Sequence, residues 1–375
     1  MGNSPEIQKI FQMSEGMDVP SVSFKFTLEK VTADAPTAQV SPINYNSNTD
    51  KGNLTNGVYL MRKNQQINFG EFPHAGKYTY KVTEVNESVT NTNITYDQNT
   101  YYMDVYVENT ENGLQIANTV ARDGENKTPA LSFLNTYRRQ DASLTVTKHT
   151  SGSGDHDLAD KTKDFDFTIT MYRAATDDNT SYTGKIGNET VTLNFGTGTT
   201  ATASFKLHDG ENLVFTGLAA GTRYKVVETG AADDYTPGVK VVENGTATVN
   251  KTASSEPESL ATADGNATNL IGEKENTVDF TNTYKNVPIT GVIMNQTTVD
   301  LFNPKTIRST MGSIYRVPFF VTKDLPGTIS SLKEQQVNVY AAHLKGTLSY
   351  DEPDYKKKTA FLIGNEGNGL SDEIA

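Results

Sequence analysis

The sequence predicts a mainly β protein, built from two tandem β-sandwiches and followed by a small, incomplete α/β segment. Within residues 1–285, apolar and polar side chains alternate with the period of two that half-buried strands show. The same order of strands occurs twice in that region, and helical periodicity begins only after residue 291. A chain of 375 residues is long enough for two or three domains that each bury a core.

Composition and charge exclude several classes of function. The chain has 33 Lys and Arg against 45 Asp and Glu, a net charge of -12. Residues 294–375 carry nine side chains of each sign, so the acidic excess lies before them and disfavours nucleic-acid binding there. Cysteine is absent, which excludes disulfides and thiolate metal sites, and we expect no metal. No signal peptide or membrane-spanning run is visible, so a leader was removed or never present.

The expected strands of the first copy follow one another in a simple order. The stretch EIQKIFQM opens the copy, and VSFKFTLEKV follows as one strand with apolar residues at every second position. Residues 41–56 are rich in Asn, Thr, Gly and Pro and predict a loop. The strands KYTYKVTE, TYYMDVYVE and LSFLNTY complete the copy, and a polar link at 138–140 leads to the second one.

One acid in each copy is predicted to point inward. In an extended strand, Glu84 of KYTYKVTE shares one side with two tyrosines and a valine, while the polar residues share the other side. The stretch RYKVVE places Glu228 on its apolar side in the same way. Burying an ionised carboxylate costs several kcal/mol unless it is paired or neutralised. We therefore expect inward partners on other strands.

Each copy supplies such partners on its first and last strands. By parity, Lys9 shares a side with apolar residues of EIQKIFQM, and Lys148 does so in SLTVTKH. On the last strands, Asn135 of LSFLNTY and Asn282 of VDFTNTY are aligned with Phe and Tyr. Two other lysines lie near the first strand. Lys25 faces the side opposite Phe24, and Lys30 lies at the end of its expected strand. Each copy thus has one inward Lys, one inward Glu and one inward Asn.

The spacing of these parts is similar in the two copies. From the inward lysine to the next Phe-x-Phe strand there are 15 residues in the first copy and 17 in the second. From the inward glutamate to the inward asparagine there are 51 and 54. Such spacing predicts two copies of one fold, an immunoglobulin-like sandwich of seven or more strands. We place the two domains at residues 1–138 and 141–285.

These three side chains can react with one another if they meet in a dry interior. Burial lowers the pKa of a lysine from about 10.4 and raises that of a carboxyl. The neutral amine can then add to the Asn carboxamide carbon, while the Glu carboxyl passes protons so that ammonia leaves. The product is an amide cross-link between first and last strands, and no cofactor is needed. The alternative is an ordinary buried hydrogen-bonded cluster.

Both copies close with F-x-N-T-Y, and in this respect residues 1–285 resemble the shaft subunits of Gram-positive pili, FctA-like in the first domain. The resemblance implies two autocatalytic intramolecular isopeptide units. In each of them the glutamate would be catalytic and the lysine and asparagine would be joined; the units are Lys9, Glu84 and Asn135, and Lys148, Glu228 and Asn282. It also implies an extracellular position on the cell wall or pilus, with neighbouring pilin subunits and sortase as partners.

Directly after the second sandwich, residues 286–291 resemble the L-P-x-T-G sorting signal of sortases. The residues of this motif are Val287, Pro288, Ile289, Thr290 and Gly291, and a sortase would cut between the last two. An apolar span and a basic tail should follow such a signal, but the chain continues IMNQTTVDLFNPK. Lys127 is a candidate acceptor for the sortase linkage.

Residues 292–375 have a different pattern, in which helices and strands alternate. We expect a helix over PKTIRSTMGSIYR, a strand at FFV, a helix at TISSLKEQQV, a strand at VNVYAA, and a last strand TAFLI that runs into a Gly-rich turn and a helix start. Amides of such a turn suit an anionic or polar ligand.

This segment is similar to SpoU-type RNA ribose methyltransferases, which have a knotted, SPOUT-like fold. The matching motifs are VDLFNPKTIRSTMGSIYRVPF and IGNEGNGLS. The resemblance implies that S-adenosylmethionine would contact Ile363, Gly364, Asn365, Glu366, Gly367, Gly369 and Leu370. The upstream Asn/Arg motif of the family is missing, and Ala375 ends the chain before the segment that would complete the pocket. We expect a truncated, inactive fragment without cofactor.

The function that the sequence favours is a structural subunit of a sortase-assembled pilus, and not an enzyme. Two alternatives stay open: a cytoplasmic S-adenosylmethionine-dependent RNA 2'-O-ribose methyltransferase with RNA as its partner, and a surface adhesin that binds a host ligand. Since a wall protein and a cytosolic RNA enzyme share no compartment, we interpret the chain as a chimera of two coding sequences joined near residues 291–295.

Overall fold

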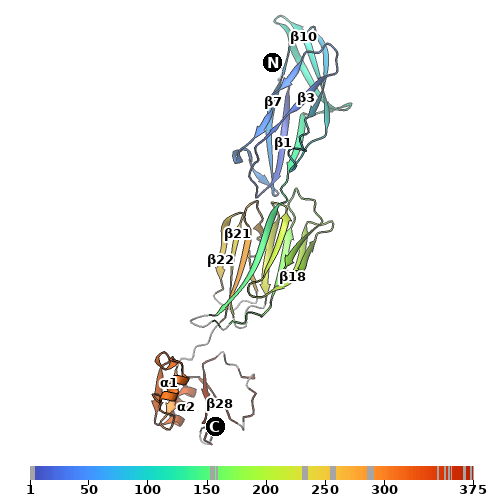
Figure 1. Cartoon of the computed structure of the whole chain (residues 1–375). Helices are drawn as coiled ribbons and strands as arrows, with labels where there is room; N and C mark the ends of the chain where they lie inside the picture. Colours follow the sequence, from blue (N-terminus) through green and yellow to red (C-terminus); the bar gives the residue numbers. More distant parts are fainter. Residues whose placement is uncertain are drawn as a thin grey trace. The chain divides into compact units, whose positions relative to one another are not determined.

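The structure, a computed structural model, describes residues 5–152, 157, 159–229, 235–253, 259–284, 291–343, 346–349, 352–353, 355, 357–365, 369–371 and 374. The chain divides into two compact units, residues 1–286 and residues 287–375. Figure 1 shows two β-sandwiches in the first unit and a few helices and short strands in the second. The predicted fold class, mainly β with a small α/β segment at the end, is confirmed.

The first sandwich packs two sheets around one apolar core. One sheet has the strand order β4-β7-β1-β13-β9, with β6 also paired to β7, and the other has the order β12-β11-β10-β8-β3. Strands β2 and β5 form a separate pair. The elements are β1 Glu6–Ser14, β2 Val22–Phe24, β3 Phe26–Lys30, β4 Ala38–Val40, β5 Ile43–Tyr45, η1 Asn48–Asp50, β6 Leu54–Thr55, β7 Val58–Phe69, β8 Gly76–Glu84, β9 Ile94–Thr95, β10 Thr100–Thr110, β11 Gly113–Asp123, β12 Asn126–Thr128 and β13 Leu131–Tyr137.

Side chains alternate between core and solvent along β1 and β8, as the period of two predicts. The stretch VSFKFTLEKV differs from the single strand expected from the sequence. It breaks at Lys25, where the chain leaves β2, which pairs with β5, and enters β3, which pairs with β8. One continuous strand cannot form there because the two halves pair with different neighbours. Lys25 itself points to solvent and forms an ion pair with Glu87 at 2.8 Å.

The second sandwich repeats this architecture with its own core. Its larger sheet has the order β17-β16-β19-β14-β25-β21-β22, and its smaller sheet has the order β18-β15-β20-β23, with β24 also on β20. The strands are β14 Ala142–Gly152, β15 Phe165–Tyr172, β16 Ser181–Ile186, β17 Glu189–Asn194, β18 Thr200–Leu207, β19 Asn212–Leu218, β20 Arg223–Thr229, β21 Tyr235–Glu243, β22 Thr246–Thr252, β23 Ser259–Ala261, β24 Asn269–Leu270 and β25 Thr277–Tyr284.

The first and last strands of each sandwich are parallel neighbours. In the first sandwich β1 runs beside β13, with Phe11 opposite Asn135. In the second sandwich β14 runs beside β25, with Thr150 opposite Asn282. The inward lysine of each first strand therefore lies two residues before the position opposite the asparagine. Since paired strands are about 4.8 Å apart, this offset puts the asparagine within reach of the lysine side chain.

Within the first unit, the two sandwiches meet at a close polar joint. The buried carboxylate of Glu15 accepts two hydrogen bonds of 2.8 Å from the guanidinium of Arg223. The hydroxyls of Ser14 and Thr176 are hydrogen-bonded at 2.7 Å. Gly221 has a φ of +95°, and a Cβ at this position would lie only 2.6 Å from the Cβ of Ser14. The joint therefore has no room for a larger side chain at residue 221.

The second unit is the predicted α/β segment, with differences in detail. Its elements are β26 Val292–Asn295, α1 Pro304–Ser309, η2 Ser313–Tyr315, β27 Phe319–Thr322, α2 Leu325–Glu334, β28 Asn338–Ala341 and β29 Thr359–Leu362. Strand β26 was not expected from the sequence. The helix predicted over 304–316 stops early because Met311 and Gly312 have positive φ values of 49° and 88°. After β29, Asn365 and Gly369 form a β-bridge, and residues 372–373 of the expected helix start lie outside the described residues.

The described part of the second unit buries few apolar side chains. Only Ile314 and Ile329 are buried hydrophobics there, while Phe302, Phe320 and Phe361 are each about 60% exposed. Its strands form two separate parallel pairs, β26 with β27 and β28 with β29. Parallel strands normally have both faces covered, whereas the described part of this segment leaves much of its apolar surface exposed. No described helix of the chain is long and apolar enough to span a membrane.

Candidate functional site

In the first sandwich, three strands bring one lysine, one glutamate and one asparagine into direct contact. The Nζ of Lys9, on β1, lies 2.9 Å from Oε1 and 3.0 Å from Oε2 of Glu84, on β8 of the facing sheet. The Nδ2 of Asn135, on β13, donates to the same Oε1 at 2.9 Å. The Lys9 and Glu84 side chains are fully buried, and so is Asn135. One carboxylate oxygen therefore bridges the amine and the amide.

The second sandwich contains the same cluster with shorter contacts. The Nζ of Lys148, on β14, lies 2.6 Å from Oε1 of Glu228, on β20. The Nδ2 of Asn282, on β25, donates to that oxygen at 2.7 Å. All three residues are 0% exposed. The structure thus brings together all six side chains that the sequence predicts to point inward, three in each sandwich.

Aromatic rings cover both lysine amines. The Nζ of Lys9 lies 4.6 Å from the ring centroid of Phe24. The Nζ of Lys148 lies 4.1 Å from the ring centroid of Phe165 and 5.8 Å from that of Phe167. These rings keep water away from the amines, so the charged forms of the clusters lack the solvation that they have at a surface.

Burial shifts the protonation of both partners towards the neutral forms. It lowers the pKa of Lys9 and of Lys148 to about 8, against the opposing attraction of the neighbouring carboxylates. Burial also raises the pKa of Glu84 and of Glu228 above its usual range. Both shifts lower the cost of moving a proton from lysine to glutamate, which leaves a neutral amine beside a protonated carboxyl.

The two clusters differ in what surrounds the asparagine oxygen. In the first sandwich the backbone N–H of Asp97 donates to Oδ1 of Asn135 at 2.8 Å. In the second sandwich, Oδ1 of Asn282 and Oε2 of Glu228 have no hydrogen-bond partner among the described residues. Sequence reasoning missed Asp97. Its surroundings, TYDQNT, have the polar pattern of any Asx turn and do not mark a site.

Other predicted site residues lie apart from these clusters. Of the sorting-signal motif, Val287, Pro288, Ile289 and Thr290 lie outside the described residues, and Gly291 is an exposed residue just before β26. Lys127, the candidate acceptor lysine, is an exposed residue on β12.

The described members of the predicted cofactor set in the second unit are exposed or half-buried. Ile363 is 82% exposed, and Asn365 and Gly369 exchange backbone hydrogen bonds of 3.2 and 2.7 Å. Gly364 needs to be glycine, since a Cβ there would lie 2.3 Å from the Gly369 carbonyl carbon. Leu370 is half-buried, and Glu366 and Gly367 lie outside the described residues.

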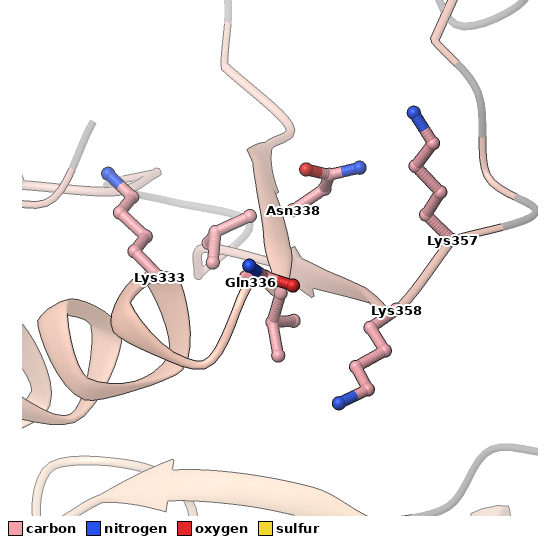
Figure 2. A pocket seen from close by; sticks show the side chains of 7 residues that line it. Lys333, Gln336, Asn338, Lys357 and Lys358 are labelled. Atoms are coloured by element: carbon pink, nitrogen blue, oxygen red, sulfur yellow. The ribbon is translucent and has the colours of Figure 1, made fainter.

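A cavity in the described part of the second unit lies away from these residues. It has a volume of about 620 Å³ and is lined by Lys333, Gln336, Val337, Asn338, Val339, Lys357 and Lys358. In Figure 2 the three lysine side chains point in different directions and do not converge on one point. Its described lining holds none of the predicted cofactor residues and no carboxylate.

Three family models match successive parts of the chain. Residues 6–138 match the Spy0128-like isopeptide containing domain, residues 142–284 match a domain of unknown function, and residues 267–375 match the SpoU rRNA methylase family. The resemblance predicted from the sequence, pilin-type sandwiches joined to a SpoU-type fragment, is confirmed by these matches.

Two curated proteins are similar to different parts of the chain. The pilus tip adhesin Cpa of Streptococcus pyogenes is 34% identical over 151 residues, which are 40% of this chain and 18% of the adhesin. The 23S rRNA (guanosine(2553)-2'-O)-methyltransferase RlmP of Bacillus subtilis is 37% identical over 79 residues, 21% of this chain and 32% of the methyltransferase. The chain therefore spans a third or less of each relative.

Among solved structures, the major pilin of Streptococcus pyogenes aligns with 76% of this chain and 100% of its own length. The identity is 23% and the TM-score is 0.34.

Proposed function

We propose that this chain is a structural subunit of a sortase-assembled cell-surface pilus, whose two sandwiches stabilise themselves by autocatalytic Lys–Asn isopeptide bonds. One observation carries the proposal: both sandwiches hold a buried lysine, glutamate and asparagine in contact, on strands of the same register. The match of residues 6–138 to an isopeptide containing domain supports it. The repetition of this arrangement, with an amine and a carboxamide on one shared carboxylate oxygen in both sandwiches, supports it further.

The chemistry follows from the contacts. After the lysine proton moves to the glutamate, the neutral Nζ adds to the Asn carboxamide carbon, and the C=O electron pair moves to Oδ1. The glutamate oxygen that contacts both nitrogens takes the second amine proton and delivers a proton to Nδ2. The C–Nδ2 bond breaks, ammonia leaves and the carbonyl re-forms as a secondary amide. Folding supplies the proximity, and effective molarities for such oriented groups can reach on the order of 10⁵ M.

The position of the bonds suits a load-bearing protein. Because the first and last strands are parallel neighbours, tension applied to the two ends of a sandwich shears β1 against β13, and β14 against β25. A bond from Lys9 to Asn135, or from Lys148 to Asn282, joins the sheared strands directly. Each bond also closes a loop of over a hundred residues, worth about 4 to 5 kcal/mol if disulfide loop entropy applies.

The remaining assignments follow from the same proposal. The modules are residues 1–138 and 141–285, a sorting signal at 286–291 that a sortase would join to a neighbouring subunit, and a SpoU-type fragment at 292–375. Lys127 would accept the linkage, and the protein would be outside the cell, on the wall or pilus. Likeness to a pilus tip adhesin favours one further role within this class, which is binding of a host ligand.

A methyltransferase function is the second candidate, because residues 267–375 match the SpoU rRNA methylase family. The described part of that segment exposes its apolar side chains and the turn expected to hold the cofactor. We infer that it contributes no catalysis in this chain.

Intact mass spectrometry of the folded full-length chain tests the main proposal. We expect a mass lower than the sequence mass by two molecules of ammonia, and branched peptides that join Lys9 to Asn135 and Lys148 to Asn282 after proteolysis. The matched control is the chain with Lys9→Met and Lys148→Met, which keeps the apolar stems but has no amines, and should have its full sequence mass. Full mass in a folded wild-type chain would refute the proposal.

A further inference from the structure

The first sandwich surrounds its asparagine with a loop that has no counterpart among the described residues of the second sandwich. Strand β9 pairs with β13 only at Thr95 and Ile94, and the chain then turns inward at Asp97. There the N–H of Asp97 donates to Oδ1 of Asn135 at 2.8 Å. This contact also determines how the amide is oriented, because a backbone N–H cannot accept a hydrogen bond from the NH₂ group. The NH₂ of Asn135 must then face Glu84.

The Asp97 side chain holds this loop in place at two points. Its Oδ2 accepts a hydrogen bond of 2.7 Å from the N–H of Leu134, and its Oδ1 accepts one of 2.8 Å from the N–H of Asn99. The preceding Tyr96 is buried and packs edge-on against Phe24, with ring centroids 5.8 Å apart. The donor therefore stands in a fixed position beside the reacting carbonyl before any reaction starts.

The second sandwich has a continuous strand at the same place. There β21 pairs with β25 along its whole length, and the residue opposite Asn282 is Pro237, which has no N–H. The next residue along β21 is Gly238, which has no side chain that could donate a hydrogen bond. Among the described residues, Oδ1 of Asn282 receives no hydrogen bond.

We propose that the backbone N–H of Asp97 is an oxyanion donor for cross-linking in the first sandwich, and that the Asp97 carboxylate is the positioning group that holds it there. This inference rests on the proposed function and names a further catalytic group for it. When Nζ of Lys9 adds to the Asn135 carbon, the carbonyl electron pair moves to Oδ1, which becomes an anion. The hydrogen bond to this oxygen strengthens as the charge develops and is kept when the carbonyl re-forms and ammonia leaves.

The test measures how fast each bond forms in full-length chains made by cell-free translation, stopped in acid at intervals and analysed for branched peptides. Asp97→Pro removes the N–H, and we expect it to slow the Lys9–Asn135 bond on the order of 10²-fold, the cost of losing one oxyanion donor in other enzymes. Asp97→Asn keeps the N–H and the acceptor for Asn99, and should stay within about tenfold of wild type. The Lys148–Asn282 bond in the same molecules is the internal control and should form at an unchanged rate.

Two results would overturn the inference: wild-type speed in Asp97→Pro, or equal slowing in Asp97→Pro and Asp97→Asn. Folding is checked by melting each variant in a Lys9→Met background, where no bond can form in the first sandwich. If the melting temperature of Asp97→Pro is much lower than that of Asp97 in this background, the rate of Asp97→Ala is the test instead. This variant keeps the N–H of residue 97 but loses the two hydrogen bonds that its carboxylate accepts. It should be at least tenfold slower than Asp97→Asn, and equal rates of these two variants would contradict the proposal.

The pH profile gives a readout that a purely structural role of Asp97 would not move. Burial raises the pKa of Glu84, and the charge of Asp97 raises it further. Asp97→Asn should therefore move the acidic limb of the rate profile to lower pH, and an unmoved limb would count against a carboxylate held beside the reacting groups. If the wild-type chain forms neither bond, the proposed function itself fails; if it forms both and no Asp97 variant differs, only this inference fails.

Discussion

The two sandwiches hold the same three types of side chain in the same strand register, but the hydrogen bonds of the asparagine differ between them. In the first, Asn135 is hydrogen-bonded on both its nitrogen and its oxygen. In the second, Asn282 is bonded only through its nitrogen among the described residues, yet its contacts to the shared carboxylate are shorter. The contact of lysine, glutamate and asparagine is thus common to both sandwiches, whereas a hydrogen bond to the asparagine oxygen occurs, among the described residues, in the first sandwich alone.

Removal of the shared carboxylate should have the largest effect. Glu228→Ala leaves Lys148 buried without its partner, which costs about 3–5 kcal/mol, and it also prevents the bond in its own sandwich. We expect one ammonia to be retained, a lower melting temperature for the second sandwich, and a normal bond in the first. Glu84→Ala should give the reverse pattern.

Mass spectrometry and calorimetry check this prediction. Lys25→Ala, which breaks only an exposed ion pair, is the control and should change the melting temperature little. Loss of both bonds in either glutamate variant would show that the two sandwiches do not react independently.

The rate of bond formation should pass through a maximum as pH is varied. At low pH both the lysine and the glutamate are protonated, so no neutral amine is present. Well above the lysine pKa of about 8, the glutamate has also lost the proton that the leaving ammonia needs. The rate should fall on both sides, by about tenfold per pH unit far from the maximum. Timed quenching of freshly translated chain measures it, and a rate that keeps rising to pH 11 would contradict the shared-proton mechanism.

Gly221→Ala should weaken the joint between the sandwiches. The added Cβ would meet the Cβ of Ser14 at 2.6 Å in a backbone of φ +95°, so we expect a loss of about 1–3 kcal/mol in the free energy of unfolding. Gly210→Ala is the matched control, because its φ is +81° but nothing lies within 4 Å of its Cβ. Equal melting temperatures for the two variants would show that only backbone strain matters and that the joint tolerates the methyl group.

The smallest expected effect concerns the second unit. Its predicted cofactor turn is exposed at Ile363, so titration of the full chain with S-adenosylmethionine should release no measurable heat. Removing residues 292–375 should leave the mass loss of the two sandwiches unchanged. Tight binding of S-adenosylmethionine would instead support a methyltransferase function.

Much of the site was predictable because strand parity is a local property. The alternation of side chains along β1, β8 and β13 indicates which lysine, glutamate and asparagine point inward, and the repeat at similar spacing supports the choice. The single strand expected over VSFKFTLEKV failed at Lys25, where the chain changes partner strand although the side chain points outward as parity predicts. Helical spacing failed at Met311, where a positive φ ends the helix. Both failures occur where tertiary pairing or backbone conformation overrides the local pattern.

By itself the sequence determined the two β repeats, the six inward polar side chains and the change to an α/β pattern after the second repeat, since each depends on side-chain periodicity. Only the tertiary structure decided that the first and last strands are parallel neighbours with a two-residue offset. It also decided that the Asp97 N–H meets the Asn135 oxygen. These features join residues far apart in the chain, and their geometry arises from sheet pairing and packing, which no local pattern encodes.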